Sequence, residues 1–189
     1  MKRGLVILLA CFALFTLAAE MLAPVYAVFV ERIGGDLLTA GGAYAIFMGV
    51  TGILIIIISK WEDRFKHLEK LVVLGFCIKV IGFTGYVFVS KPMHLFLVQV
   101  ILGLGEAVSL PAHDGLYSQL LDRGKYASEW GMYDALWYIT AAVAGIIGGA
   151  ISNYLGFKML FFLMIIISLA GLFVSLRLMV DKYKRKVPF

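Results

Sequence analysis

The chain has 189 residues, of which 62% are hydrophobic and 15% are charged, and its mean hydropathy is +0.95. A soluble domain carries many more charged residues, so this composition excludes a soluble globular protein and places nearly the whole chain in a lipid bilayer. The formal net charge of +5 arises from 17 Lys and Arg against 12 Asp and Glu.

Six apolar runs follow one another along the chain, at residues 4–30, 39–59, 71–90, 94–118, 131–155 and 159–180. Each is near or above the about 20 residues that a helix needs to cross about 30 Å of hydrocarbon. We therefore predict an all-α, polytopic membrane protein with six transmembrane helices. No Ser/Pro-rich linker interrupts the chain, so residues 1–189 are expected to form a single domain. Pro24 and Pro111 are expected to interrupt the first and fourth helices.

Basic residues fall almost entirely on alternate connections between the runs. Thirteen lie at the two ends and in the second and fourth connections: Lys2, Arg3, Lys60, Arg64, Lys66, Lys70, Arg123, Lys125, Arg177, Lys182, Lys184, Arg185 and Lys186. The opposite connections hold only Arg32, Lys91 and Lys158. Because cytoplasmic loops keep Lys and Arg, we predict that both termini are cytoplasmic, in a prokaryotic inner or plasma membrane. The basic tail is expected to contact anionic lipid headgroups and no nucleic acid.

Small residues recur at four-residue spacing in two of the runs. The second run has Gly41, Ala45 and Gly49, and the fifth has Ala141, Gly145 and Gly149. In lipid, small residues let helix backbones approach one another, so these four glycines are expected to pack helices together. The shared spacing in the second and fifth runs is compatible with a three-plus-three inverted repeat. The alternative is that small residues are simply common in membrane helices.

Polar and ionisable side chains also lie inside the apolar runs, where each is costly. They are Glu20 in the first run, Lys79 in the third, Gln99, Glu106, His113 and Asp114 in the fourth, and Asp134 in the fifth. Gln99, Glu106 and His113 recur every seven residues and therefore share one helix face. Because desolvated carboxylates bind protons more tightly, we predict that all of these residues except Lys79 form a pathway for a substrate and protons.

Two other interpretations of the same residues stay open. Glu20, Lys79 and Glu106 are alternatively buried ion pairs that only fix the register of the helices. A metal site built from Glu20, Glu106 and His113 is the weaker alternative. The sequence has no catalytic triad, phosphate-binding glycine loop or metal-ligand motif, so we predict no enzyme, no metal and no cofactor.

Aromatic residues cluster at the start of the fifth run. Trp130 and Tyr133 fit the aromatic belt at the membrane surface. Trp137 and Tyr138 lie deeper, with Asp134 one turn from Tyr138. We predict that Trp137 and Tyr138 line a cavity for an aromatic or cationic solute.

Three segments resemble motifs of the major facilitator superfamily, in the family's order. After the second run, SKWEDRFKHLEK resembles the family's loop G-x-L-x-D-R-x-x-R-K, and Asp63 and Arg64 match its central pair. Ser59 and Trp61 stand where the family has Gly and Leu. The resemblance implies that Asp63 and Arg64 form a conformational latch and bind no ligand.

The fourth run resembles the pattern R-x-x-x-G-x-x-x-x-x-x-x-P at Gly103 and Pro111, and Gln99 stands where the family often has an arginine linked to proton coupling. In the fifth run, Gly148 and Gly149 match the end of a motif typical of antiporters. The preceding Gly, Gly and Pro of that motif are replaced by Thr140, Ala144 and Gly145. This decay weakens an assignment as an antiporter.

The resemblance implies a secondary transporter that moves a small-molecule solute by alternating access. The family usually has twelve helices in two six-helix halves, whereas this chain has six. Alone, such a half exposes its cavity-lining helices to lipid, so we expect a parallel homodimer related by an axis along the membrane normal. Proton coupling through Glu20 and Glu106 is expected.

Three other functions remain as alternatives. The first is a non-transporting regulatory or assembly subunit, which would not lose solute flux when Glu106 is neutralised. The second is the N-terminal half of a split or truncated twelve-helix transporter, which an adjacent gene for a second six-helix chain would support. The third is a membrane-embedded enzyme that uses the acidic and histidine residues inside the bilayer.

Overall fold

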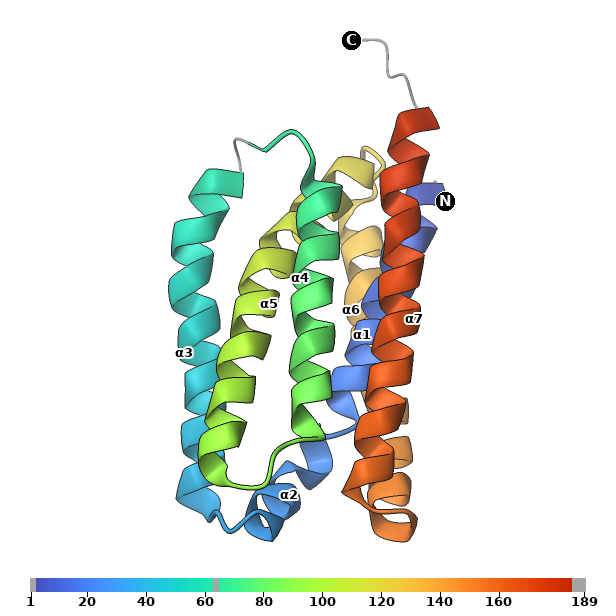
Figure 1. Ribbon diagram of the computed structural model, residues 1–189. Coiled ribbons are helices and arrows are strands. Elements are labelled where there is room, and N and C mark those ends of the chain that lie inside the picture. The colour runs from blue at the N-terminus through green and yellow to red at the C-terminus, as the bar shows by residue number, and fades with distance from the viewer. Residues whose placement is uncertain (1–2, 63–64, 185–189) are drawn as a thin grey trace.

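The computed structural model describes residues 3–62 and 65–184, and the chain is helical throughout most of these ranges. In chain order the elements are α1 (Arg3–Glu20), a 3-10 turn η1 (Ala23–Val25), α2 (Tyr26–Arg32), α3 (Leu37–Glu62), α4 (Leu68–Tyr86), α5 (Pro92–Leu120), α6 (Tyr126–Tyr154) and α7 (Phe157–Lys184). Figure 1 shows the long helices running side by side in one bundle. The prediction of an all-α fold is confirmed.

Five segments of the described chain are long and apolar enough to cross a membrane: Arg3–Arg32, Leu37–Trp61, Pro92–Leu120, Tyr126–Tyr154 and Phe157–Met179. The sixth long helix, α4, has 19 residues and carries Glu69, Lys70 and Lys79. These three charges set it apart from the other five segments, whose apolar stretches carry at most two. It nevertheless runs along the bundle beside α5 (Figure 1), so six rods correspond to the six predicted runs.

The first predicted helix is broken in the structure. Regular α-helix ends at Glu20, the 3-10 turn η1 contains Pro24, and a second helix begins at Tyr26. Proline has no backbone N–H and its ring collides with the carbonyl four residues earlier, which explains the break. Pro111 behaves differently, because α5 continues through it from Pro92 to Leu120. The expected interruption of the fourth helix is therefore wrong.

Helix α3 begins at a side-chain cap. One carboxylate oxygen of Asp36 accepts hydrogen bonds from the Thr39 hydroxyl, at 2.6 Å, and from the Thr39 backbone N–H, at 2.7 Å. These two bonds, the hydroxyl first, lower the pKa of Asp36 below its ordinary value. Because the cap needs the ionised carboxylate, it is present above the unfolded pKa and is lost as the pH falls through the folded one.

The helix contacts follow a twofold pattern. α4 packs on α5 and α7, α1 packs on α7 and α6, and α3 packs on α5. The six membrane segments are, in chain order, α1 with α2, then α3, α4, α5, α6 and α7. Exchanging the first three segments with the last three converts the α4–α5 contact into the α7–α1 contact and the α3–α5 contact into the α6–α1 contact. The α4–α7 contact is unchanged by the exchange. An inverted three-plus-three repeat predicts this correspondence.

Two close approaches between helices occur at Gly75, which the sequence analysis did not single out, and at Gly103, which it named as a motif match. A Cβ atom added to Gly75 of α4 would lie 2.5 Å from Ser109 Cβ and 2.7 Å from the Gly105 carbonyl oxygen of α5. A Cβ added to Gly103 of α5 would lie 3.0 Å from the Phe47 carbonyl oxygen of α3. These positions need glycine because backbone or Cβ atoms already fill the space.

The glycines that were predicted to pack helices lie elsewhere. Within the described chain, a Cβ at Gly41, Gly49 or Gly149 would meet no atom within 4 Å, and one at Gly145 would meet only Pro24 Cγ at 3.7 Å. Gly149's neighbour Gly148 makes the close contact instead, against the Met21 carbonyl. Gly41, Gly49 and Gly149 therefore lie on open faces of α3 and α6, where they do not pack against another helix of the described chain.

Helices α3 and α6 are the least covered of the five apolar segments. Of the 18-residue apolar stretch in each helix, 11% is buried within the described chain in α3 and 17% in α6, against 56% in α5. α3 lies at an edge of the bundle against α5 (Figure 1), and α6 packs mainly against α1. Their remaining faces need lipid or another protein to cover them.

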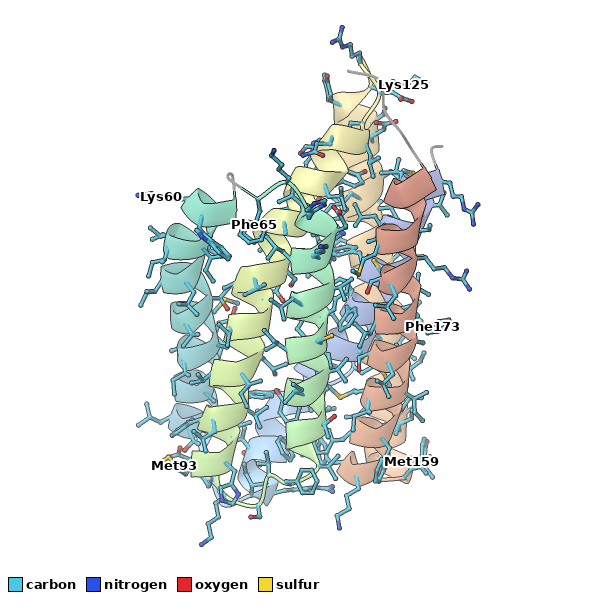
Figure 2. All side chains as sticks on the ribbon, turned by 45° about the horizontal axis from the view of Figure 1, so that its top comes forward. Lys60, Phe65, Met93, Lys125, Met159 and Phe173 are labelled. Atoms are coloured by element: carbon cyan, nitrogen blue, oxygen red, sulfur yellow. The ribbon has the colours of Figure 1, made fainter. Side chains whose placement is uncertain are left out.

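Both ends of the described chain lie at one end of the bundle, together with the α3–α4 and α5–α6 connections (Figure 1). Figure 2 places Lys60 and Lys125 at this end and Met93 and Met159 at the opposite one. The connections that are rich in Lys and Arg therefore gather at the end that holds both termini.

The glycine contacts give a direct test of packing. Gly75→Ala is expected to lower the free energy of unfolding by about 1–3 kcal/mol, because the added methyl group overpacks α4 against α5. Gly52→Ala, in α3 with no atom within 4 Å of the added Cβ, is expected to be neutral or to stabilise slightly, since Ala favours a helix over Gly. Thermal unfolding in mild detergent measures both, and equal effects of the two changes would contradict the packing described here.

Candidate transport cavity

A cavity of about 710 Å³ lies among the helices. Its volume is in the range of small-molecule sites, about 300–1,000 Å³. Nine aromatic residues line the cavity, from α1, α2, α3, α4 and α6: Phe12, Phe15, Tyr26, Tyr44, Phe47, Phe76, Phe83, Tyr86 and Trp137. The apolar rings give the cavity its shape, and a few polar groups between them give it its chemistry.

The lining residues of each helix follow one helix face. On α1 the cavity is lined at positions 12, 15, 16, 19 and 20, and on α3 at positions 44, 47, 48 and 51. α4 contributes positions 76, 79, 83 and 86, and α5 contributes 99, 102, 106 and 110. Spacings of three and four residues place side chains on the same side of a helix. Extending the faces of Glu20 and Lys79 by this spacing would have found Phe12, Phe15, Phe76, Phe83 and Tyr86, which the sequence analysis missed.

Lys79 and Glu106 form an ion pair across the α4–α5 contact. Lys79 Nζ lies 2.6 Å from Glu106 Oε2, and the two side chains are 12% and 28% exposed. The ammonium group also lies 5.3 Å from the centroid of the Phe76 ring and 5.9 Å from that of Phe15. The ion pair that the alternative interpretation expected is present between these two residues, and Glu20 takes no part in it. Attraction between the charges is strong here because little water surrounds them.

Glu20 is the other acidic residue of the cavity. It is the last residue of α1, immediately before the break at η1, and its side chain is partly buried. Among the residues that the structure describes, Glu20 has no hydrogen-bond or ion-pair partner. Its carboxyl group therefore differs from that of Glu106, which Lys79 neutralises.

Gln99 links three helices at the cavity wall. Its Nε2 donates to the Tyr26 hydroxyl of α2 at 2.7 Å and to the Tyr86 hydroxyl of α4 at 3.2 Å. The side chain is only 5% exposed. At the position where the family resemblance expects an arginine, this chain thus has a neutral donor that orients two phenol groups.

His113 lies behind the wall and does not line the cavity. Its ring is 3% exposed and lies between Phe12 and Tyr133, with ring centroids 5.3 Å and 5.7 Å away. Nδ1 lies 3.4 Å from Asp114 Oδ1, and Nε2 has no partner within the described residues. The predicted polar stripe therefore reaches the cavity at Gln99 and Glu106, whereas the Phe12 ring covers its third member.

The remaining predicted pathway residues point in different directions. Trp137 lines the cavity, whereas Tyr138 is 67% exposed and lies outside it. Adjacent residues on a helix diverge by about 100°, so the two cannot share one face. Asp134 is exposed on α6, and the side chain of Asp114 is 42% exposed. Neither is among the residues that line the cavity.

Two further predictions concern latch and metal residues. Asp63 and Arg64, the predicted latch, lie outside the described residues. Within residues 3–62 and 65–184, no group of three or more His, Cys, Asp or Glu side chains is arranged to hold a metal ion. Glu20 and Glu106 line the cavity while His113 does not, so the weaker alternative of a metal site built from all three does not match the geometry.

Comparisons with known proteins agree with this architecture. The family model described as Major Facilitator Superfamily matches residues 8–189. The MFS-type transporter YitZ of Bacillus subtilis is 26% identical over 147 residues, which cover 77% of this chain and 88% of YitZ. The quinolone resistance protein NorB of Staphylococcus aureus is 26% identical over 162 residues, which cover 84% of this chain and 34% of NorB.

The chain thus spans most of the length of one relative and about a third of the length of the other. The family model covers nearly the whole chain, and the helices have the length and composition of membrane spans. The protein is therefore a multi-pass integral membrane protein. It belongs to the major facilitator superfamily, a family of transporters and not of enzymes.

Proposed function

We propose that this chain is one half of a secondary transporter, which moves a small solute across the membrane by alternating access as a parallel homodimer. The observation that carries the proposal is the cavity of about 710 Å³, which contains ionisable groups in a wall of aromatic rings. A membrane protein without transport activity has little reason to keep charges inside its bundle, because each is costly there.

The assembly follows from the open faces of α3 and α6. Ile53 and Ile56 of α3 are 64% and 65% exposed, and Ile146 of α6 is 76% exposed. Gly41, Gly49 and Gly149 lie on the same two helices with free space beside them. Small residues beside large apolar ones allow close helix packing in lipid. We therefore assign Gly41, Gly49, Gly145 and Gly149 to the contact between two copies.

The orientation follows from the loop charges. The end of the bundle that holds both termini also holds Lys60 and Lys125 (Figure 2), so the charge rule places this end in the cytoplasm. Both copies of a dimer obey the same rule, and a parallel arrangement about an axis along the membrane normal satisfies it. The bacterial relatives support a plasma membrane location.

Glu20 and Glu106 are the proposed proton carriers. Carboxyl groups in surroundings of low dielectric constant bind and release protons as their solvation changes. Glu106 is paired with Lys79, so this pair must open before Glu106 accepts a proton. Opening and closing of a contact between α4 and α5 would couple the proton to a movement of helices.

The proposed solute pathway includes further residues from the sequence analysis. Gln99 and Trp137 line the cavity beside the two carboxylates. His113, Asp114, Asp134 and Tyr138 lie off the cavity in this conformation, so their proposed role belongs to another state of the transport cycle. Asp63 and Arg64 keep the latch role that the family resemblance gives them.

A second candidate is half of a larger transporter that pairs with a different chain. The match to NorB covers 34% of that protein, as expected if NorB contains a second part with no counterpart here. The open faces of α3 and α6 would then contact the other half. This candidate has the same cavity but a different partner.

Native mass spectrometry in lipid nanodiscs or mild detergent, across a dilution series, tests the assembly. We expect twice the chain mass of 20.9 kDa. Gly49→Trp is expected to shift the protein to monomers, because the indole fills the space that the second copy needs. Phe173→Trp, on the exposed side of α7 (Figure 2), is the control and should not. A stable wild-type monomer would rule out the homodimer and favour the second candidate.

Proteoliposomes with an imposed pH gradient test transport. We expect uphill flux of at least one member of a panel of aromatic cations, anions and neutral solutes. Glu106→Gln should reduce this flux at least about tenfold, because a carboxamide cannot carry a proton. Glu31→Gln, which removes a charge from the exposed side of α2, should keep it. Flux that is unchanged in Glu106→Gln would contradict the coupling role, and a folded wild type that moves nothing would favour a non-transporting subunit.

The ion pair makes a separate prediction about stability. Lys79→Met or Glu106→Gln alone should lower the free energy of unfolding by about 2–4 kcal/mol, because each leaves one charge without its partner. The double variant should regain most of the loss while still lacking proton-coupled flux. Thermal unfolding of the four proteins measures the cycle. Losses that simply add in the double variant would mean that the two charges do not interact.

A further inference from the structure

We propose that the cavity binds organic cations with an aromatic or apolar body, and that Glu20 supplies the opposite charge. This inference rests on the proposed function in taking the cavity as the solute site. It goes beyond that function by naming the class of solute and by giving Glu20 and Glu106 different roles.

The first step is the charge balance of the cavity. Its wall contains three charged side chains, Glu20, Lys79 and Glu106. Lys79 and Glu106 neutralise one another at 2.6 Å. Glu20 has no partner in the part of the chain that the structure describes. The ionised cavity therefore carries one uncompensated negative charge, which attracts a cation and repels an anion.

The second step is the cost of leaving Glu20 alone. A carboxylate that is withdrawn from water needs hydrogen bonds or an opposite charge. No side chain of the described protein supplies either to Glu20. A positively charged solute does, and the contact is stronger than in bulk water because Glu20 is partly buried. An anion would instead need Lys79, which Glu106 already occupies.

The third step is the aromatic wall. The faces of aromatic rings attract cations when the charge lies within about 6 Å of the ring centre. The protein already shows this in the cavity, because Lys79 Nζ lies 5.3 Å from the Phe76 ring and 5.9 Å from the Phe15 ring. Trp137 lines the cavity from α6. Tryptophan attracts cations more strongly than the other aromatic residues do. Bulky organic ammonium or phosphonium groups, which have apolar surfaces, suit such a wall better than small hydrated ions.

Tetraphenylphosphonium and tetraphenylborate form a matched pair of probes, since they share size and shape and carry opposite charge. Their binding to purified protein in detergent is followed by the fluorescence of Trp137 in a variant with Trp61→Phe and Trp130→Phe, which leaves one of the three tryptophans. We expect saturable quenching by the phosphonium. The borate should bind at least tenfold more weakly once partitioning into protein-free micelles has been subtracted.

Variants of Glu20 then assign the charge. Glu20→Gln should weaken phosphonium binding at least tenfold, and Glu20→Asp should restore most of it. Glu31→Gln removes the same charge from α2 outside the cavity and should leave binding within about twofold. Because Glu20 has no partner in the described chain, its replacement is not expected to impair folding, and the size-exclusion profile checks this. Equal binding of the two probes, or unchanged phosphonium binding in Glu20→Gln, would overturn the inference.

The same probes separate this inference from the proposed function. Binding in detergent needs no gradient and no movement of solute. Phosphonium binding that depends on Glu20, together with no flux in proteoliposomes, would keep the cation site and reject the transporter. Uphill flux confined to anions would keep the transporter and reject the cation site.

Discussion

The ion pair between Lys79 and Glu106 is the interaction on which the cavity depends. A charge inside a helix bundle is costly, and each of these two residues is stabilised there by the other at 2.6 Å. The pair permits a lysine in α4, joins α4 to α5 and removes two charges from the electrostatic balance of the cavity. Glu20 thereby becomes the site's uncompensated acidic group. One contact thus links helix packing to the charge that a solute meets.

Glycines at the contact between α4 and α5 determine how closely these helices pack. α4 approaches α5 at Gly75 and Gly105, where the backbones leave no room for a side chain, and the ion pair lies one turn along from this contact. α3 and α6 make fewer contacts and keep broad apolar faces open. A tightly joined core with two open edge helices is the arrangement expected of a half that functions beside another half. The twofold pattern of helix contacts makes the two edges equivalent.

Much of the fold could be predicted from hydropathy because bilayer thickness sets the length of an apolar helix. All six runs correspond to helices, and the loop charges anticipated which connections share one end of the bundle. The errors were local. Pro24 breaks its helix while Pro111 does not, and hydropathy does not distinguish the two prolines. Of the predicted pathway residues, Glu20, Gln99, Glu106 and Trp137 line the cavity.

By itself, the sequence determined the class of the protein, because composition, run length and loop charge are properties of single segments in contact with lipid and water. Only the tertiary structure decided which buried groups meet. Lys79 pairs with Glu106 and, among the described residues, leaves Glu20 without a partner. Gly148 and not Gly149 faces another helix, and the Phe12 ring packs against His113. These outcomes depend on the rotation and separation of helices that are distant in sequence. The periodicity of one helix gives the residues on a face and not the neighbour that the face meets.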